Sequence, residues 1–145
     1  MRREALLWLR AGWEDLFDAE LMLEEGRWFR AAFFAQQAVE KALKALYPVV
    51  AGREPPRLHN VVELYRGLRG LGFRLPGELE EKLYRLNKYY TVTMCPDAAN
   101  GLPSESVDSE EAREAVGVAR RVLELVEEVV REAEEAGAEG GGGGG

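Results

Sequence analysis

Alanine recurs every three or four residues within the stretch FRAAFFAQQAVEKALKALY, residues 29–47. Because each residue turns an α-helix by about 100°, these alanines share one narrow face of a helix. They are Ala31, Ala35, Ala38, Ala42 and Ala45. A face of such small side chains allows a neighbouring backbone to approach closely. The stretch therefore predicts a helix that packs inside a helical bundle.

The rest of the chain also places apolar residues at helical spacing, and no window sustains the alternation of a β-strand. Glycine and proline mark the ends of the periodic segments. The predicted helices cover residues 2–25, residues 28–50, residues 61–71, a segment that starts after Pro76, and a last segment that Asp108 caps and that ends near residue 135. The sequence thus predicts an all-α fold, an antiparallel up-and-down bundle of four long helices plus a short crossover helix.

The domain organisation follows from length and from two segments without apolar periodicity. A chain of 145 residues is long enough for one domain with its own core. Residues 91–107, TVTMCPDAANGLPSESV, contain two prolines and a glycine, so we expect a long ordered loop of the kind that often carries function. The bundle should occupy residues 1–136, and the glycine-rich tail, residues 137–145, should be disordered.

Composition argues against several classes of protein. With one cysteine, Cys95, and one histidine, His59, neither a disulfide nor a metal site built on these residues is expected, and we expect no cofactor. No apolar run reaches the roughly 20 residues of a membrane span, and the N-terminus lacks the pattern of a signal peptide, so we expect a cytoplasmic protein. Scarce asparagine, glutamine and cysteine suit a thermophile. Of the net charge of −7, most lies in residues 104–139.

Polar residues gather on the second predicted helix, opposite the alanine face. They are Gln37, Glu40, Lys41 and Lys44. The simplest interpretation is a solvated face on which Glu40 and Lys44 form an i,i+4 ion pair. Two functional alternatives stay open at this point: an interface between copies, to which Phe33 would contribute, and a patch that faces phosphate through its two lysines.

Several motifs occur in an order that resembles one known family. Trp8 or Trp13 and then Asp15 come first, and the pattern Q-x2-E-K-x2-K of the second helix follows. His59 then opens the short helix, and the stretch YTVTMCPDAANG precedes the acidic start of the last helix. Together these motifs resemble the HEPN domain (higher eukaryotes and prokaryotes nucleotide-binding), in which the last stretch reads Y-x-P-T-R-Y-P-D.

The resemblance implies a helical bundle that commonly pairs as a homodimer. Many members are encoded beside a minimal nucleotidyltransferase and act in toxin-antitoxin pairs. It therefore implies a partner of such an enzyme or a module that binds nucleotide or RNA, with a dimer interface that includes residues 91–107. The candidates for binding or interface roles are Gln37, Glu40, Lys41, Lys44, His59, Tyr90 and Asp97.

The residues that make some HEPN proteins ribonucleases are not at the expected place. In those members an arginine is followed four to six residues later by a histidine, near the start of the last helix. Here Met94 and Cys95 replace the arginine and the tyrosine of the family's stretch, and no histidine follows. We therefore predict no catalytic residue and a non-catalytic protein. The alternative is a metal-independent ribonuclease that uses non-standard residues.

Three residues have other interpretations. Arg53 and His59 satisfy the arginine-histidine spacing, but they lie in the linker before the short helix, so we do not expect them to be a catalytic pair. His59 would instead satisfy a backbone group at a helix N-terminus. Tyr90 is equally well explained as a core or interface residue.

Overall fold

The computed structural model describes residues 2–94 and 106–144, with side chains for residues 2–90 and 106–137. These residues form helices and no β-strand, which confirms the predicted all-α bundle. None of the described helices is long and apolar enough to span a membrane. The elements are α1 (Arg2–Glu24), α2 (Trp28–Leu46), the π-helical turn η1 (Tyr47–Ala51), α3 (Val61–Arg69), α4 (Gly77–Met94) and α5 (Ser109–Gly144).

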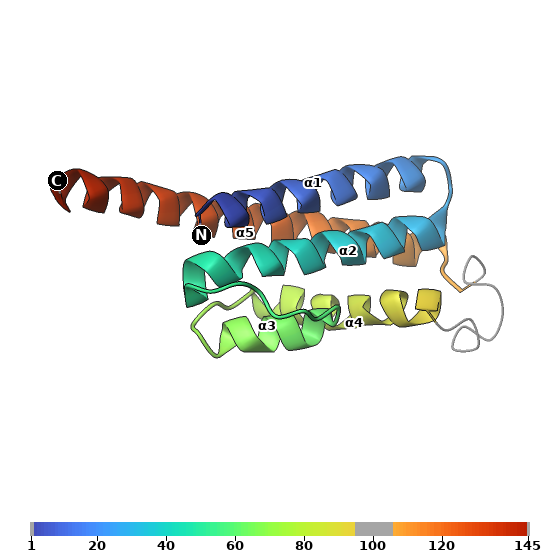
Figure 1. Cartoon of the computed structure of the whole chain (residues 1–145). Helices are drawn as coiled ribbons and strands as arrows, with labels where there is room; N and C mark the ends of the chain where they lie inside the picture. Colours follow the sequence, from blue (N-terminus) through green and yellow to red (C-terminus); the bar gives the residue numbers. More distant parts are fainter. Residues whose placement is uncertain (1, 95–105, 145) are drawn as a thin grey trace.

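Helix α2 lies in the middle of the bundle. Figure 1 shows α1 and α2 side by side and antiparallel, with α5 behind them and with α3 and α4 along the other side of α2. Helix α2 contacts all four of the other α-helices and η1. The five alanines of the small face have no exposed surface, which confirms that this face is buried. A helix surrounded in this way buries more than one of its faces.

A proline changes the end of α2. Pro48 has no backbone N–H, so it cannot donate the hydrogen bond that would continue a regular α-helix. The helix continues as the wider π-helical turn η1, which ends at Gly52, a residue whose left-handed φ of 66° suits glycine. The hydroxyl group of Tyr47 donates to the backbone oxygen of Leu64, 2.8 Å away, and so joins the end of α2 to α3. The predicted second helix is therefore α2 together with η1.

Two asparagines hold the start of α3. The side-chain oxygen of Asn60 accepts hydrogen bonds from the backbone N–H groups of Val62 and Glu63, at 3.0 and 3.1 Å. The N–H group of Val61 donates to the side chain of Asn87 on α4, at 3.1 Å. These bonds fix the residue before the cap, His59, between α2 and α4.

The last two helices are longer than predicted. Helix α4 continues to Met94, so residues 91–94 do not belong to the predicted loop, and the helix ends two residues before Pro96, which disfavours helical backbone in the residue before it. The rest of that loop, residues 95–105, lies outside the described residues. Helix α5 begins as predicted, because Asp108 accepts a hydrogen bond from the N–H of Glu111 at 2.8 Å.

At its other end, α5 reaches Gly144 rather than stopping near residue 135. Figure 1 shows this end extending past the start of α1, away from the other helices. Glycine costs about 1 kcal/mol relative to alanine in a helix interior. The glycine-rich turns at the end of α5 are therefore helical although their residues have a low intrinsic preference for helix. The division of the chain into a bundle and a disordered tail stays a prediction.

Candidate functional site

Three polar residues spaced by four along α2 are buried: Gln36, Glu40 and Lys44 are 0%, 3% and 6% exposed. A solvated face was the simplest interpretation of the predicted stripe, but two of its four residues, Glu40 and Lys44, are among these buried residues, and Gln37 and Lys41 are partly buried. That interpretation is wrong because α2 lies at the centre of the bundle, where α1 and the linker before α3 cover this face. The predicted i,i+4 pair itself is present, with 3.2 Å between the Lys44 ammonium and one carboxylate oxygen of Glu40.

The carboxylate of Glu40 is the centre of the cluster. Its Oε2 atom lies 3.2 Å from Nζ of Lys44 and 3.3 Å from Nδ1 of His59. Its Oε1 atom is buried and has no hydrogen-bond partner among the described residues. The ammonium group of Lys44 also lies 5.3 Å from the ring centroid of Trp8, a cation–π contact. The cluster therefore contains a buried ion pair with an unused acceptor.

His59 connects this buried pair to solvent. Its backbone oxygen accepts a hydrogen bond from the side chain of Gln36 at 3.3 Å, and its ring stacks on Tyr90 with centroids 5.2 Å apart and planes 15° apart. The side chain is 58% exposed. When Nδ1 carries the proton and donates to Glu40, Nε2 is left as an acceptor. Asn60 is the N-cap of α3, so the cap role expected for His59 is wrong.

The other lysine of the stripe belongs to a separate pair. Nζ of Lys41 lies 2.5 Å from the carboxylate of Asp15 on α1. Burial raises the pKa of Asp15 above its ordinary value, although the hydrogen bond from Lys41 acts in the opposite direction. Gln37 donates to the side-chain oxygen of Gln36 at 2.7 Å. Lys41 and Gln37 thus flank the cluster on the same helix.

The structure brings together Glu40, Lys44, His59 and Tyr90 out of the predicted candidates. Asp97 lies outside the described residues. Arg53, whose spacing to His59 imitates the family motif, lies 5.3 Å over the ring of Tyr47 instead. Sequence reasoning missed Gln36 and Trp8 as members of the cluster. The signal for Gln36 was its place four residues before Glu40, since residues at i, i+4 and i+8 lie on one side of a helix.

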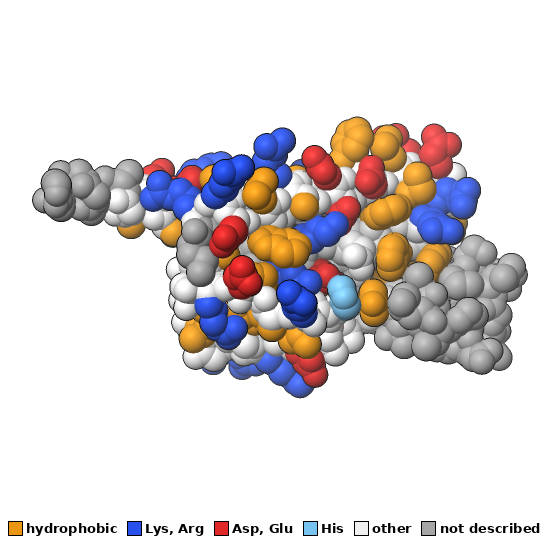
Figure 2. All heavy atoms as spheres, viewed as in Figure 1, with side chains coloured by type: hydrophobic (Ala, Val, Ile, Leu, Met, Phe, Trp, Pro, Cys, Tyr) orange, Lys and Arg blue, Asp and Glu red, His pale blue; other side chains and the backbone are white. Residues whose placement is uncertain are grey.

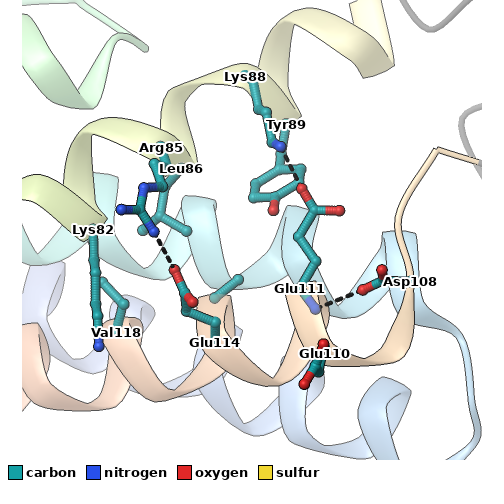
Figure 3. A pocket seen from close by; sticks show the side chains of 11 residues that line it. Lys82, Arg85, Leu86, Lys88, Tyr89, Asp108, Glu110, Glu111, Glu114 and Val118 are labelled. Atoms are coloured by element: carbon teal, nitrogen blue, oxygen red, sulfur yellow. Dashed lines mark hydrogen bonds and ion pairs between the residues drawn. The ribbon is translucent and has the colours of Figure 1, made fainter.

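Apart from the Glu40 cluster, a hollow of about 510 Å³ lies between α4 and α5. Figure 3 shows its two walls, with Arg85 paired to Glu114 at 3.0 Å and Lys88 paired to Glu111. Burial raises the pKa of Tyr89 in this wall, and the nearby carboxylate of Glu111 adds to the effect. Both of these cations already face a carboxylate, so this hollow is a weak receptor for an anion.

The cluster around Glu40 reaches the surface of the molecule at His59. Within residues 2–94 and 106–144 no group of three or more histidine, cysteine, aspartate or glutamate residues is placed to hold a metal ion. Figure 2 shows the imidazole exposed on the face in view, beside lysine or arginine and hydrophobic side chains. A stacked ring with an acceptor nitrogen suits an aromatic ligand that carries a hydrogen-bond donor.

Comparison with known proteins agrees with the motifs. The model of the HEPN domain matches residues 5–129. A crystal structure of TT1696 from Thermus thermophilus is similar, with 35% identity, a TM-score of 0.77, and coverage of 89% of this chain and 99% of that chain. The comparison with curated proteins gave no significant match.

Two further solved structures are similar at 26% identity. One is ST0689, an archaeal HEPN homologue, with a TM-score of 0.71 and coverage of 88% of this chain and 98% of that one. The other is a HEPN domain protein from Thermotoga maritima, with a TM-score of 0.51 and coverage of 90% and 97%. The family model covers most of the chain, and the fold and motifs agree with it. The chain therefore belongs to the HEPN domain family.

Proposed function

We propose that this HEPN domain is a non-catalytic module that binds a nucleotide or single-stranded RNA at the surface formed by His59 and Tyr90. The observation that carries the proposal is the exposed imidazole, which is stacked on Tyr90 and held from behind by the buried carboxylate of Glu40. A side chain fixed from two sides loses little conformational entropy when a ligand binds, so more of the contact energy appears as affinity.

The ligand class follows from the chemistry of the exposed atoms. Every nucleobase has a π-face, and stacking on an aromatic side chain contributes about 1–3 kcal/mol per base. Lys41 lies on α2 beside Glu40, and its side chain is 28% exposed, compared with 8% for that of Lys44.

The unused oxygen of Glu40 narrows the ligand further. A buried acceptor without a donor costs about 1–3 kcal/mol, and a ligand that supplies a donor would recover part of this cost. Exocyclic amino groups of bases and hydroxyl groups of ribose are such donors. Because Oε1 is covered in the structure, this contact would require a small rearrangement of the side chains above it.

Binding without cleavage fits the residues at the other end of the chain. The HEPN ribonucleases that the motifs resemble use an arginine and a histidine near the last helix, whereas this chain has Met94 there and a single histidine in total. Cleavage of RNA needs a group that takes the proton of the 2′-hydroxyl and a cation that stabilises the phosphorane.

Fluorescence anisotropy with a labelled single-stranded RNA of about ten nucleotides tests the proposal, with mononucleotides as competitors. We expect His59→Ala and Tyr90→Ala to weaken binding about tenfold each, a loss of one stacking contact. Tyr90→Phe, which keeps the ring, should retain affinity, and Lys82→Ala, two turns earlier on α4 where the lysine pairs with Glu78, should have no effect. Absence of binding by the unaltered chain, or equal binding by all variants, would refute the proposal.

A second candidate function has one observation in its favour. A carboxylate that holds Nδ1 of a histidine and leaves Nε2 free is also the arrangement of a general base. His59 would take the proton of a 2′-hydroxyl, the 2′-oxygen would attack phosphorus, and the bond to the 5′-oxygen would break with a proton from water. Incubation of the labelled RNA with the protein in excess chelator decides between the two, because cleavage that disappears in His59→Ala would establish a ribonuclease.

The partner proposed for the module is a minimal nucleotidyltransferase, as in toxin-antitoxin pairs of the family. Family membership supports this proposal. Co-expression of the chain with a nucleotidyltransferase encoded next to it, followed by copurification through a tag on one component, tests it. Separate elution of the two proteins would contradict it.

A further inference from the structure

Helix α1 has two seams of residues at alternating spacings of three and four. The inner seam is buried against the bundle and consists of Ala5, Leu9, Gly12, Leu16 and Ala19. The outer seam is exposed and consists of Arg3, Leu7, Arg10, Glu14, Phe17, Leu21 and Glu24. This alternation is the heptad spacing by which one helix packs along another. The inner seam has its partner in the bundle, and no described element covers the outer one.

Large apolar side chains in the outer seam face solvent. Leu7, Phe17 and Leu21 are 54%, 64% and 40% exposed. Along the upper edge of Figure 2, where Figure 1 places α1, hydrophobic side chains interrupt the charged ones. Within the described residues Arg10 and Glu14 take part in no ion pair, although several neighbouring charges do. The seam therefore has exposed apolar side chains together with two charged groups, Arg10 and Glu14, that form no ion pair within the described residues.

We propose that the outer seam of α1 binds the outer seam of a second copy of this chain, in antiparallel orientation. With the two-fold axis beside residue 12, Leu7 lies opposite Phe17 of the second copy, and Arg10 lies opposite its Glu14. Each contact occurs twice by symmetry. Arg10 thus pairs with an opposite charge and Leu7 with an aromatic ring, while Leu21 lies opposite the side chain of Arg3.

Other arrangements of the same two helices put like charges together. A parallel pair would place Arg10 opposite its own copy and Glu14 opposite its own copy. An antiparallel pair shifted to set Leu7 opposite Leu21 would place Glu14 opposite Glu14. Like charges directly opposed across an interface disfavour an arrangement, so the charge pattern favours the register with Arg10 opposite Glu14 over these two arrangements.

The surface of α1 also has hollows where this register needs them. Trp13, Glu14, Phe17 and Asp18 line a hollow of about 390 Å³, and Glu4, Leu7 and Trp8 line one of about 250 Å³. In the proposed pair, Leu7 of one copy enters the hollow beside Phe17 of the other, and the reverse also holds. This is the packing of a side chain into a gap between four others that coiled coils use.

The interface proposed here lies mainly on another side of the molecule from the nucleotide surface, although Trp8 contacts Lys44 and also lines the hollow beside Leu7. Asp15 and Trp8, which contact the stripe of α2, lie on a different side of α1 from Arg10 and Phe17. It also differs from the dimer surface that the sequence suggested around residues 91–107, most of which lies outside the described residues.

Sedimentation equilibrium of the full chain with two single variants tests the pairing. Arg10→Glu puts two Glu–Glu contacts into its own dimer, and Glu14→Arg puts two Arg–Arg contacts into its own. We expect each to weaken self-association about tenfold. An equimolar mixture of the two variants should associate at least as strongly as the unaltered chain, because each contact then joins opposite charges. An ion pair between Arg10 and Glu14 of the same helix would not be restored by mixing the two variants, so recovery in the mixture requires a contact between chains.

Matched controls and contrary outcomes complete the design. Leu71→Lys, at an exposed leucine outside α1, should leave association unchanged, and thermal melts of all variants should coincide within a few degrees. A chain that stays monomeric at about 100 μM would overturn the proposal. A dimer that neither variant weakens would exclude this surface of α1 as the interface. Variants that are weakened but whose mixture does not associate again would exclude the register with Arg10 opposite Glu14.

Discussion

The backbone of Gly12 on α1 lies directly against the backbone of Ala38 on α2. A methyl group on Gly12 would stand 3.2 Å from the carbonyl oxygen of Ala38 and 2.9 Å from a methyl group of Leu123. The small face of α2 thus meets a residue without a side chain, and α5 closes the gap from the third side. This contact explains why the alanines of α2 recur at helical spacing.

Replacement of Gly12 by alanine should therefore destabilise the bundle, although alanine is the better helix former. The added methyl group forces the helices apart, and we expect a loss of about 1–2 kcal/mol in the free energy of unfolding by urea. Gly117→Ala is the matched control, because nothing lies within 4 Å of a methyl group there. It should gain about 0.5–1 kcal/mol. Equal effects of the two substitutions would contradict the close approach.

The buried pair of Glu40 and Lys44 leads to a second prediction. Lys44→Met leaves a carboxylate buried without its cation, and we expect a loss of about 3 kcal/mol in unfolding free energy. The double variant Glu40→Gln/Lys44→Met should lose less, since no charge remains buried. The exposed pair of Glu78 and Lys82 has the same spacing, and Lys82→Met should change stability by less than about 0.5 kcal/mol. Similar losses for the two lysines would show that burial does not matter.

Helical periodicity predicts most of the fold because each helix has its own apolar face. It predicts the start of α1 at Arg2 and that of α2 at Trp28. The predicted cap Asp108 precedes α5, whereas Asn60 and not His59 caps α3. It does not predict the continuation of α4 to Met94, because YTVTM has no apolar period and its helix is an extension of the turns before it. The widened turn at Pro48 is likewise a local adjustment that periodicity does not resolve.

The candidate site was less accessible to sequence reasoning. The pattern of α2 shows that Glu40 and Lys44 face the same side, but only the position of α2 in the bundle shows that this side is buried. The contact between Glu40 and His59 joins residues 19 apart in the chain, and the stack of His59 on Tyr90 joins residues on different elements. Such contacts depend on how the linker folds back over α2, for which no local spacing gives a signal.

Buried tyrosines predict a loss of stability in alkali. Burial raises the pKa of Tyr47 above its ordinary value of about 10, so the folded state holds this proton more tightly than the unfolded state. The contribution is complete below pH 10 and falls as the pH rises above it. Urea unfolding between about pH 8.5 and 11.5, about one and a half units on either side of the ordinary pKa, should show a shallower decline for Tyr47→Phe. An identical slope in both proteins would contradict the role of Tyr47.

The end of α5 should add little to stability. Figure 1 shows it extending beyond the other helices, so a chain that ends at Ala136 should unfold within about 0.5 kcal/mol of the full chain. A chain that ends at Val129 loses Val130, which is 1% exposed, and should lose at least about 1.5 kcal/mol. A large loss from the first truncation would mean that the tail packs on the bundle.

Nuclear magnetic resonance of the imidazole of His59 tests the proposed binding surface most directly. The chain has one histidine, so its ring ¹⁵N and ¹H signals need no assignment by mutation. On titration with adenosine or guanosine monophosphate, or with the short RNA, we predict a saturable shift of the Nε2 and ring-proton signals, and no such shift with inorganic phosphate plus ribose. Imidazole signals that stay constant while the RNA binds would place the ligand elsewhere and contradict the central claim.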